Sequence, residues 1–462
     1  MIEVKEKAKI KTKEFEFDLK DDAKIKQFVD SFEYVPFLYL SKLYSQSGNT
    51  LDPKDIVYVK LFNNKFLPEI EISCYDSTGI FFTDLYPFDH DSLISIFVKS
   101  SSELNLPIRM DFRVTEFETV KSSSTIDKRQ ILKYLIRGIL DVDNLHYVNF
   151  EARKGTSYEI LKNIALEMNL GFATNVADSE DDMTWINPGL SYLNFIAEIT
   201  EIAYIQEDSF VWTFIDFYYN LNYINIELEL NQNLKEQQTF TTPALIKQQE
   251  EELVNLYLTN NPAFMETNKF IDKFNLINQS YKINLEKAYK YIARWYNKDE
   301  NKVYREELND IETNDDNLRP LYDYDSEIFE RNFDGEYIGK IDEDNVHEHY
   351  PITKSINKFN LQNIEKLKMI VTLPQINFDI KRFQNVRVEI YNINDVFSSG
   401  SNDSPIDNIN ESLSGYWFVS GINYLYRRSG GVAQEITLIR RDLNIEYTDR
   451  YDLRKLTKNN NK

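Results

Sequence analysis

The 462-residue sequence has little of several residue types that define common classes of protein. Its single cysteine, Cys74, excludes an intrachain disulfide framework and a cysteine-based zinc cluster. Only 13 glycines and 12 prolines are present, too few for a fibrous chain or one dominated by linkers. There is no run of about 18 apolar residues that could span a membrane, and the charged N-terminal segment lacks the apolar core of a secretion signal. We therefore expect a globular protein without a membrane segment, synthesised in the cytoplasm.

The sequence also lacks an excess of positive charge. Lys and Arg number 53 against 75 Asp and Glu, which gives a formal net charge of −22 at pH 7. General affinity for nucleic acid needs Lys and Arg to displace phosphate counterions, so this composition argues against it. An acidic surface fits a protein past which nucleic acid slides without sticking. The same balance also fits an ordinary soluble acidic protein.

Motifs for nucleophilic, phosphate-binding or dinucleotide chemistry are missing as well. His347 and His349 place two imidazoles on one side of an extended segment, but without the spacing of a helical zinc motif we expect a surface pair. Acidic residues are so abundant that no Asp/Glu pair for glycoside cleavage stands out, which leaves a hydrolase open as an alternative. The sequence accordingly predicts no catalytic residue, no cofactor and no metal site, and Cys74 is expected to be a small core residue.

Strand patterns dominate the first 118 residues. Apolar and polar side chains alternate at 57–61, 70–74 and 108–114, and polar turn residues separate these runs. Several short strands with regular turns are typical of a β-barrel or sandwich. Residues 1–118 are therefore predicted to form a first β domain, either a barrel or a sandwich.

The period of the apolar residues then changes. From Ile131 to Leu140 they recur at helical spacing, which predicts a helix. Thr156 and Glu159 form a capping box that begins a second helix, and Gly171 lies where a left-handed C-cap belongs. A third helix from about 191 and a strand at 209–215 complete a predicted α/β domain at 119–220.

The remainder is predicted to be a second β-barrel interrupted by an insertion. Apolar and polar residues alternate over Ile224–Leu230, which predicts a strand, but the next clear strand pattern begins only at Lys368. Between them, 248–258 and 266–277 are predicted to be helices. The expected domains are therefore a split β-barrel at 221–239 plus 366–445, a mixed and partly helical insertion at 240–365, and a polar tail at 446–462. The fold class is α+β multidomain.

The insertion contains a strongly acidic segment. Residues 299–348 hold 18 Asp and Glu against 5 Lys and Arg, a net charge of −13. Such runs are usually solvated surface segments. The sequence assigns this one no further role.

Residues 415–441 form the clearest hairpin of the sequence. Both arms are rich in β-branched and aromatic residues, and a polar, glycine-containing loop joins them. Trp417 and Val419 lie on one face and Phe418 on the other, and Gly421 marks a bend or bulge. A strand pair that is apolar on both faces sits between two layers, or between a core and another subunit.

Basic residues are grouped at Lys381–Arg382 and, on the hairpin, at Arg427, Arg428, Arg440 and Arg441. The two hairpin pairs are expected to be near each other. They can serve solubility and protection of strand edges, or they can form a docking rim for an acidic partner. We therefore treat the four hairpin arginines as candidate partner-docking residues.

With these patterns the chain resembles the baseplate hub, or tail hub, proteins of tailed bacteriophages. Two stretches, about a quarter of the chain, carry the resemblance. The first is KGTSYEILKNIALEMNLGFATN at 154–175, continuing through DMTWINP at 182–188 to FIDFYYNLNYI at 214–224. The second is GYWFVSGI at 415–422 through ITLIRR at 436–441. The order of domains matches more broadly, because proteins of this family have two tube-like β-barrels, an α/β domain between them and an insertion that splits the second barrel. The resemblance therefore implies that residues 1–118 form a tube-like β-barrel. The acidic part of the insertion matches nothing in the family.

The resemblance implies a structural virion protein of the tail or baseplate and no enzyme activity. It implies a homotrimer whose six barrels form a ring, with tail tube or tube-initiator proteins on one side and a spike or needle protein on the other. DNA would pass through the channel without specific binding. The alternatives are a tail-associated cell-wall or polysaccharide hydrolase and a host-surface binding module. Host, tail type and the identity of the axial partners stay open.

Overall fold

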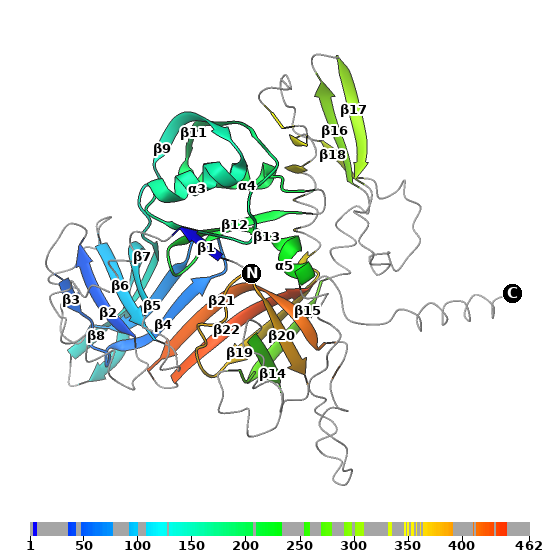
Figure 1. Ribbon diagram of the computed structural model, residues 1–462. Helices are drawn as coiled ribbons and strands as arrows, with labels where there is room; N and C mark the ends of the chain where they lie inside the picture. The colour runs from blue at the N-terminus through cyan, green and yellow to red at the C-terminus, as the bar shows by residue number, and fades with distance from the viewer. Residues whose placement is uncertain are drawn as a thin grey trace, which may run out of the picture.

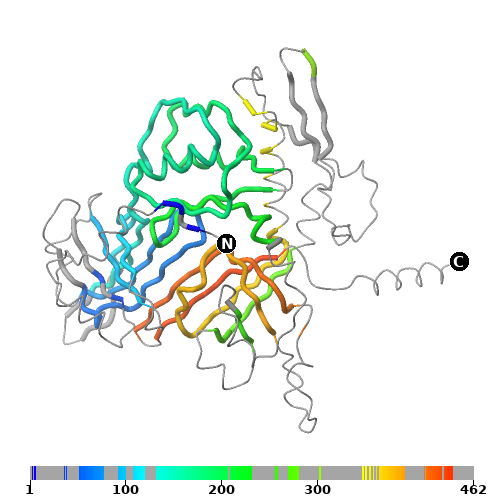
Figure 2. The backbone as a smooth tube through the Cα atoms, in the orientation of Figure 1, coloured from blue at the N-terminus to red at the C-terminus, as the bar shows by residue number. Residues whose placement is uncertain are grey.

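The computed structural model describes the larger part of the chain, and it is mostly β-sheet with few helices (Figure 1). The described residues are 3–6, 36–42, 48–76, 92–99, 108–126, 129–206, 209–232, 254–258, 269–279, 291–297, 301–308, 331–334, eight residues between 346 and 361, 364–390, 410, 413–428 and 431–440. Two β units lie side by side beneath a middle unit that contains the helices, as the backbone tube also shows (Figure 2). No helix of the described part is long and apolar enough to cross a membrane.

The first β unit follows the predicted alternation. In β4 and β5 the side chains of Val59, Leu61, Ile70 and Ile72 are buried, and each strand pairs antiparallel with the next. The strands of this unit are β2 (Phe37–Lys42), β3 (Gly48–Thr50), β4 (Ile56–Asn63), β5 (Glu69–Tyr75), β6 (Ser92–Val98), β7 (Ile108–Ile126) and β8 (Arg129–Leu140). The core residue Cys74 is fully buried, as predicted, and burial raises the pKa of its thiol.

The helix predicted from Ile131 to Leu140 is wrong, because this stretch is strand β8. It pairs antiparallel with β5 and with β7. Its even-numbered side chains, such as Tyr134 and Ile136, are buried, while odd-numbered apolar residues such as Leu135 are half-buried. A strand with apolar residues on both faces can show the same spacing of apolar residues as a helix. Pairing with strands distant in the sequence makes this segment a strand. The pairing of β8 therefore carries the first sheet to Leu140, beyond the predicted limit at 118.

The middle unit confirms the predicted helices and their start signals. Thr156 is the N-cap of α3, and its capping box with Glu159 is present. Ser191 caps the next helix. The C-cap prediction at Gly171 is wrong: Asn169 takes the left-handed conformation, and Gly171 already begins a strand. The elements are β1 (Glu3–Glu6), β9 (Val148–Gly155), α3 (Ser157–Glu167), β10 (Gly171–Thr174), β11 (Met183–Ser191), α4 (Tyr192–Ile202), β12 (Val211–Ile215), β13 (Asn220–Asn225) and α5 (Ile226–Gln232).

The strand predicted at Ile224–Leu230 is a second error. Its first two residues end β13, which pairs with β10 and β12 in the sheet of the middle unit, and the rest is helix α5. Ile226 and Leu230 are four residues apart and pack into a cluster shared with the second β unit. The alternating pattern therefore comes from the end of a strand followed by a short helix with one apolar face, because positions i and i+4 lie on the same face of a helix.

The second β unit draws strands from both sides of the acidic segment. The helices predicted at 248–258 and 266–277 are wrong in their described parts, which contain strands instead: β14 pairs parallel with β20, and β15 pairs antiparallel with β19. The strands are β14 (Val254–Leu258), β15 (Lys273–Asn278), β19 (Leu367–Leu373), β20 (Asn385–Ile390), β21 (Gly415–Arg427) and β22 (Gly431–Arg440). Between β15 and β19, the strands β16 (Tyr291–Asn297), β17 (Lys302–Leu308) and β18 (Arg331–Asp334) form a separate three-stranded sheet.

The predicted hairpin is confirmed as β21 and β22, and it joins the two β units. β21 pairs with β22 along its length, with β20 through Gly415–Phe418, and with β4 of the first unit through Ile422–Arg427. The predicted irregularity at Gly421 is present as a register shift between Val419 and Gly421. Both β units therefore belong to one 13-stranded sheet.

Candidate functional site

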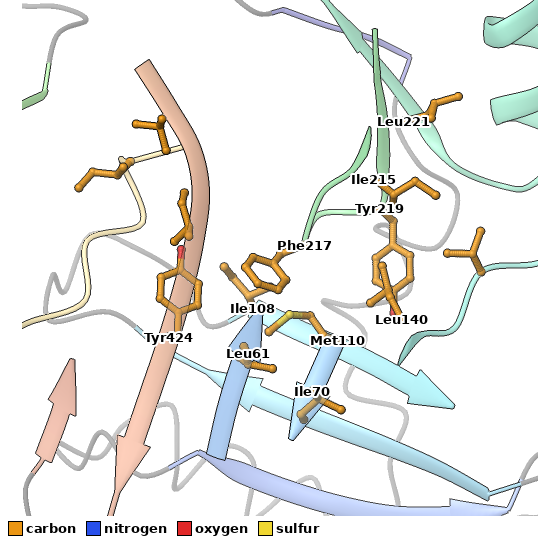
Figure 3. Close-up of a cluster of buried hydrophobic side chains, with 14 of the residues drawn as sticks. Leu61, Ile70, Ile108, Met110, Leu140, Ile215, Phe217, Tyr219, Leu221 and Tyr424 are labelled. Carbon is orange, nitrogen blue, oxygen red and sulfur yellow. The ribbon is translucent and has the colours of Figure 1, made fainter. Parts of the chain in front are cut away.

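The three units meet at one junction. Side chains of the β12–β13 turn enter the core of the first β unit, where Phe217 lies beside Met110 and faces Tyr424 of β21 (Figure 3). The rings of Phe217 and Tyr424 are stacked with centroids 5.4 Å apart. The hydroxyl of Tyr219 accepts a hydrogen bond from the backbone N–H of Asp111, at 2.8 Å. The middle unit is thus packed into the seam between the β units.

The hairpin lies between two layers, as its two apolar faces predicted. Trp417 and Val419 belong to the main core, while Phe418 and Ile439 belong to a second cluster that the middle unit completes. The indole N–H of Trp417 donates to the carbonyl of Leu413 at 2.9 Å. Successive side chains of β21 pack into opposite layers. A shift in the register of β21 would therefore expose one of these side chains.

Arg382 occupies the centre of the junction. Its side chain is 4% exposed and donates to three backbone carbonyls, those of Ser420, Asn64 and Lys65, and to the side-chain oxygen of Asn63. Three aromatic rings surround the guanidinium, those of Trp212, Phe214 and Phe383. Burial lowers the pKa of Arg382 to about 9, so the group is still charged at neutral pH. Among the described residues none of its hydrogen-bond partners is a carboxylate. In the sequence, Arg382 stands out only as one of the basic pair Lys381–Arg382. The one sequence feature that could have indicated its burial is the neighbouring Phe383, in the segment between two strands.

The four candidate docking arginines do not form one group. Arg427 and Arg428 are exposed at the turn of the hairpin. Arg440 lies at the opposite end of β22, about 30 Å away at the usual rise per strand residue. There its guanidinium covers the indole of Trp417 and donates to the carbonyl of Ser414. The expectation that the two pairs are neighbours is therefore wrong, because the hairpin separates them along its length. Arg441 is outside the described residues.

A second surface feature is an exposed apolar face on the ribbon of β9 and β11. Four of the five large apolar side chains that are exposed in the described part gather there: Phe150 (79%), Ile186 (65%), Tyr147 (59%) and Val148 (54%). On the inner face of the same ribbon, Arg153 pairs with Glu151 and Glu167. Glu151 and Arg153 of β9 are thus turned inward, while Phe150 and Lys154 lie on its exposed face. Exposed apolar patches of this kind mark contact surfaces.

The polar groups of the middle unit are structural rather than accessible. Asp181 accepts hydrogen bonds from the backbone N–H of Ser157, the hydroxyl of Ser179 and the backbone N–H of Tyr204. Burial raises the pKa of this carboxyl group. Ser157 and Asp181 are both fully buried, so this serine–aspartate pair holds the start of α3 and does not face a substrate.

His347 and His349 do not form the expected surface pair. His347 is 7% exposed, and the ring of His349 stacks on Tyr204 with centroids 3.9 Å apart. Both histidines therefore pack against the end of the middle unit. Within the described part of the chain, no group of three His, Cys, Asp or Glu side chains could hold a metal ion.

Comparison with known proteins gives matches among solved structures only. No family model and no curated protein matches the chain. It is similar to a tail protein from Neisseria meningitidis MC58, at 9% identity and a TM-score of 0.48, over 88% of this chain and 97% of that chain. It is also similar to the 43 kDa tail protein of prophage MuSo2 from Shewanella oneidensis, at 10% identity and a TM-score of 0.48, over 88% and 99%.

A third similar structure is an Escherichia coli component of the type VI secretion system, described as structurally similar to bacteriophage T4 tail proteins. It shares 10% identity with a TM-score of 0.40, over 87% of this chain and 76% of that chain. Two of these neighbours are described as tail proteins and the third as a secretion-system component.

Proposed function

We propose that this chain is a structural subunit of a bacteriophage tail or baseplate hub ring. The observation that carries the proposal is that strand β21 belongs to both β units. The two units are therefore held side by side in one sheet and form a single wide building block (Figure 1). We infer that each unit curves into a tube-like barrel. In the second unit, a bridge between Tyr257 and Phe270 brings β14 next to the segment that leads into β15.

The proposed assembly is a homotrimer. Tail tubes are built of sixfold rings and central spikes are threefold, so a subunit with two similar β units can join the two symmetries. Three copies arranged around one axis would supply six β units in a closed ring. Tube or tube-initiator proteins would bind one side of this ring and a spike or needle protein the other.

The proposed channel of the ring passes nucleic acid without binding it. The net charge of −22 gives the chain little general attraction for phosphate backbones. An acidic wall repels DNA and keeps it mobile during ejection.

We assign the exposed ribbon face of β9 and β11 to contact with the next copy in the ring. Phe150 is the most exposed large apolar residue of the face, and its ring lies directly over Gly189, where a Cβ atom would be 2.5 Å from the ring. The absence of a side chain at Gly189 therefore leaves room for the tip of the ring to lie against the ribbon. An apolar patch of a few hundred Å² is smaller than the roughly 800 Å² per partner of a stable complex, so it would form one part of the subunit contact.

The turn with Arg427 and Arg428 is the proposed axial docking point. Both side chains are exposed and lie at one end of the shared hairpin, where an axial neighbour can reach them. Arg440 is instead committed to Trp417 within its own unit.

The test of the proposal is the mass of the purified chain. We expect about three times the 54.7 kDa monomer mass in native mass spectrometry and light scattering. A strictly monomeric species at micromolar concentration would contradict the ring. Incubation with cell-wall material separates the proposal from the hydrolase alternative, because a hub subunit releases no fragments.

A further inference from the structure

We propose that Arg382 is the residue that fixes the two β units in one continuous sheet, by filling the fork at which β21 changes its pairing partner. This role of Arg382 rests on the proposed function in one respect: a ring subunit must present its two β units at one fixed angle. The fork itself is a property of the single chain.

The fork lies at Ser420 and Gly421. Before it, Phe418 pairs with β20 of the second unit. After it, Ile422 pairs with Asn63 of β4 in the first unit. The carbonyl of Ser420 falls between these two ladders, and the Nε–H of Arg382 donates to it at 2.7 Å.

The other nitrogens of Arg382 reach across to the first unit. Nη2 donates to the carbonyl of Asn64 at 3.3 Å, and Nη1 donates to the carbonyl of Lys65 and, at 3.5 Å, to the side chain of Asn63. These acceptors lie at and just after the end of β4. The planar guanidinium has five donors in a fixed fork, so it can hold acceptors on both sides of the gap at once.

The middle unit closes the site around the charge. The guanidinium carbon is 4.6 Å from the ring centroid of Phe214 and 5.9 Å from that of Trp212, both on β12, and 4.7 Å from that of Phe383. Aromatic faces attract a cation, and more strongly where water is excluded. Carbonyl dipoles and ring faces therefore stabilise a buried charge that would otherwise be costly. All three units thus contribute to one side chain.

The backbone at the fork is shaped for this close approach. At Gly421 a Cβ atom would lie 2.9 Å from the Cβ of Asn64, so a larger residue would push the two strands apart. Phe383, next to the arginine, has a φ of 64°, which is unfavourable for a bulky residue. Such strain persists only where the surroundings enforce it. One unusual backbone conformation, at Phe383, and one close approach of two strands, at Gly421, therefore lie beside the buried arginine.

The volume of the side chain alone does not explain why position 382 is an arginine. A methionine could occupy a similar volume, but it would leave the carbonyls of Ser420, Asn64 and Lys65 without their donor. A lysine would keep the charge but could not span both sides of the fork with its single ammonium group. The proposal therefore predicts a graded loss of pairing between β4 and β21, from Arg through Lys to Met.

The experiment is hydrogen exchange followed by mass spectrometry on the full chain, comparing the wild type with R382K and R382M. We expect exchange in Val59–Asn63 and Ile422–Tyr426 to speed up by about tenfold or more in R382M and by less in R382K. Exchange in the β19–β22 and β5–β8 pairs should keep its wild-type rate. Thus the two β units would separate at their seam while each remains folded.

The matched control is R440M, which removes another arginine that covers an aromatic ring and donates to a carbonyl, those of Trp417 and Ser414 in the second unit. It should leave Val59–Asn63 unchanged. Unchanged exchange at the seam in R382M, or an equal increase in every strand, would overturn the proposal. If R382M does not fold, the same two outcomes are judged on R382K. A wild-type chain that is monomeric would refute the ring, whereas the exchange pattern would still decide the role of Arg382.

Discussion

The two β units are similar in kind, but the chain supplies them differently. The first is built from one stretch, residues 36–140, in which most strands pair with a neighbour close in sequence. The second joins 254–278 to 367–440, and its Val254 pairs with Val386. Closing such long loops costs conformational entropy before any contact compensates for it. The second unit also makes contacts outside itself.

Those outside contacts come from the middle unit. Phe210, Phe214 and Ile226 pack with Phe383, Phe418 and Ile439 in a cluster that neither unit forms alone. The side-chain amide of Asn385 also donates to the carbonyl of Glu229 in α5. The middle unit also reaches the first unit through Phe217 and Tyr219, but with the second unit it shares a separate apolar cluster. Perturbing one unit at a time tests this contrast.

The largest expected effect is that of Trp417→Ala. Trp417 is 1% exposed, so its loss should cost about 3–5 kcal/mol of unfolding free energy, including the cavity left behind. The second unit should then lose exchange protection at lower urea than the first. Phe112→Ala, at a fully buried position of the first unit, is the matched control and should reverse the order. If both variants unfold both units together, the two units are one cooperative body and the contrast fails.

How much of this fold the sequence predicts depends on how local the signal is. Thr156 and Glu159 predicted the start of α3 because a capping box lies within four residues. The alternation in β4 and β5 was equally clear, because each strand has one well-buried face. By contrast, β14 and β15 are short, and their partners β20 and β19 lie about a hundred residues further on. A pairing of that range leaves no periodic signal in a single short segment.

In the candidate site, too, the sequence predicted the features that depend on one segment and missed those that depend on several. The two apolar faces of the hairpin and the irregularity at Gly421 were readable, because they follow from residues within one segment. Arg382 was not, because its partners come from three separate parts of the chain and are mostly backbone carbonyls. Backbone acceptors carry no mark in the side-chain sequence. The ribbon face of β9 and β11 was also missed, since exposure of Phe150 can be judged only after the strands are placed.

Gly421→Ala should have the next largest effect, and it acts on the seam between the units. The new Cβ would meet Asn64 at 2.9 Å, so the strands must separate or bend, at about 1–3 kcal/mol. We expect increased exchange in Val59–Asn63, with the remaining strands of both units retaining their protection. Gly138→Ala is the comparison within the first unit, where the new Cβ would lie 2.7 Å from the carbonyl of Arg113. It should disturb the β7–β8 pair and spare the seam.

Replacing residues 280–360 by a short loop, which keeps Leu361 and Ile364 in the cluster shared with the middle unit, should change stability less. The backbone N–H of Gln279 donates to the carbonyl of Lys366 at 2.9 Å, so the two ends already meet. Loop-closure entropy changes slowly with length, and a shorter loop favours the folded state slightly. The contacts of Asn357 with the middle unit would be lost. We expect the β15–β19 pair to retain its exchange protection, and its loss would show that the segment is an integral part of the second unit.

The smallest effect on folding is expected from changing Arg427 and Arg428 together to Ser. Both side chains are exposed at the hairpin turn, away from the core that the two β units share. Thermal unfolding should therefore match the wild type. If the turn is the axial docking point, the double variant should bind a tube or spike protein more slowly, and the difference should shrink as salt is raised, because charges at a rim act mainly on association rate.

The matched control for this double variant is Lys54→Ser with Lys65→Ser, which removes two exposed positive charges from the first unit and leaves the turn intact. Co-assembly is measured over a salt series for all three proteins. An equal loss in the control would mean that net charge, and not the turn, controls docking. Unchanged co-assembly of the double arginine variant at every salt concentration would remove these residues from the docking surface. An unstable double variant would instead show that the turn supports the seam, where the backbone N–H of Arg428 donates to the carbonyl of Val57 at 3.1 Å.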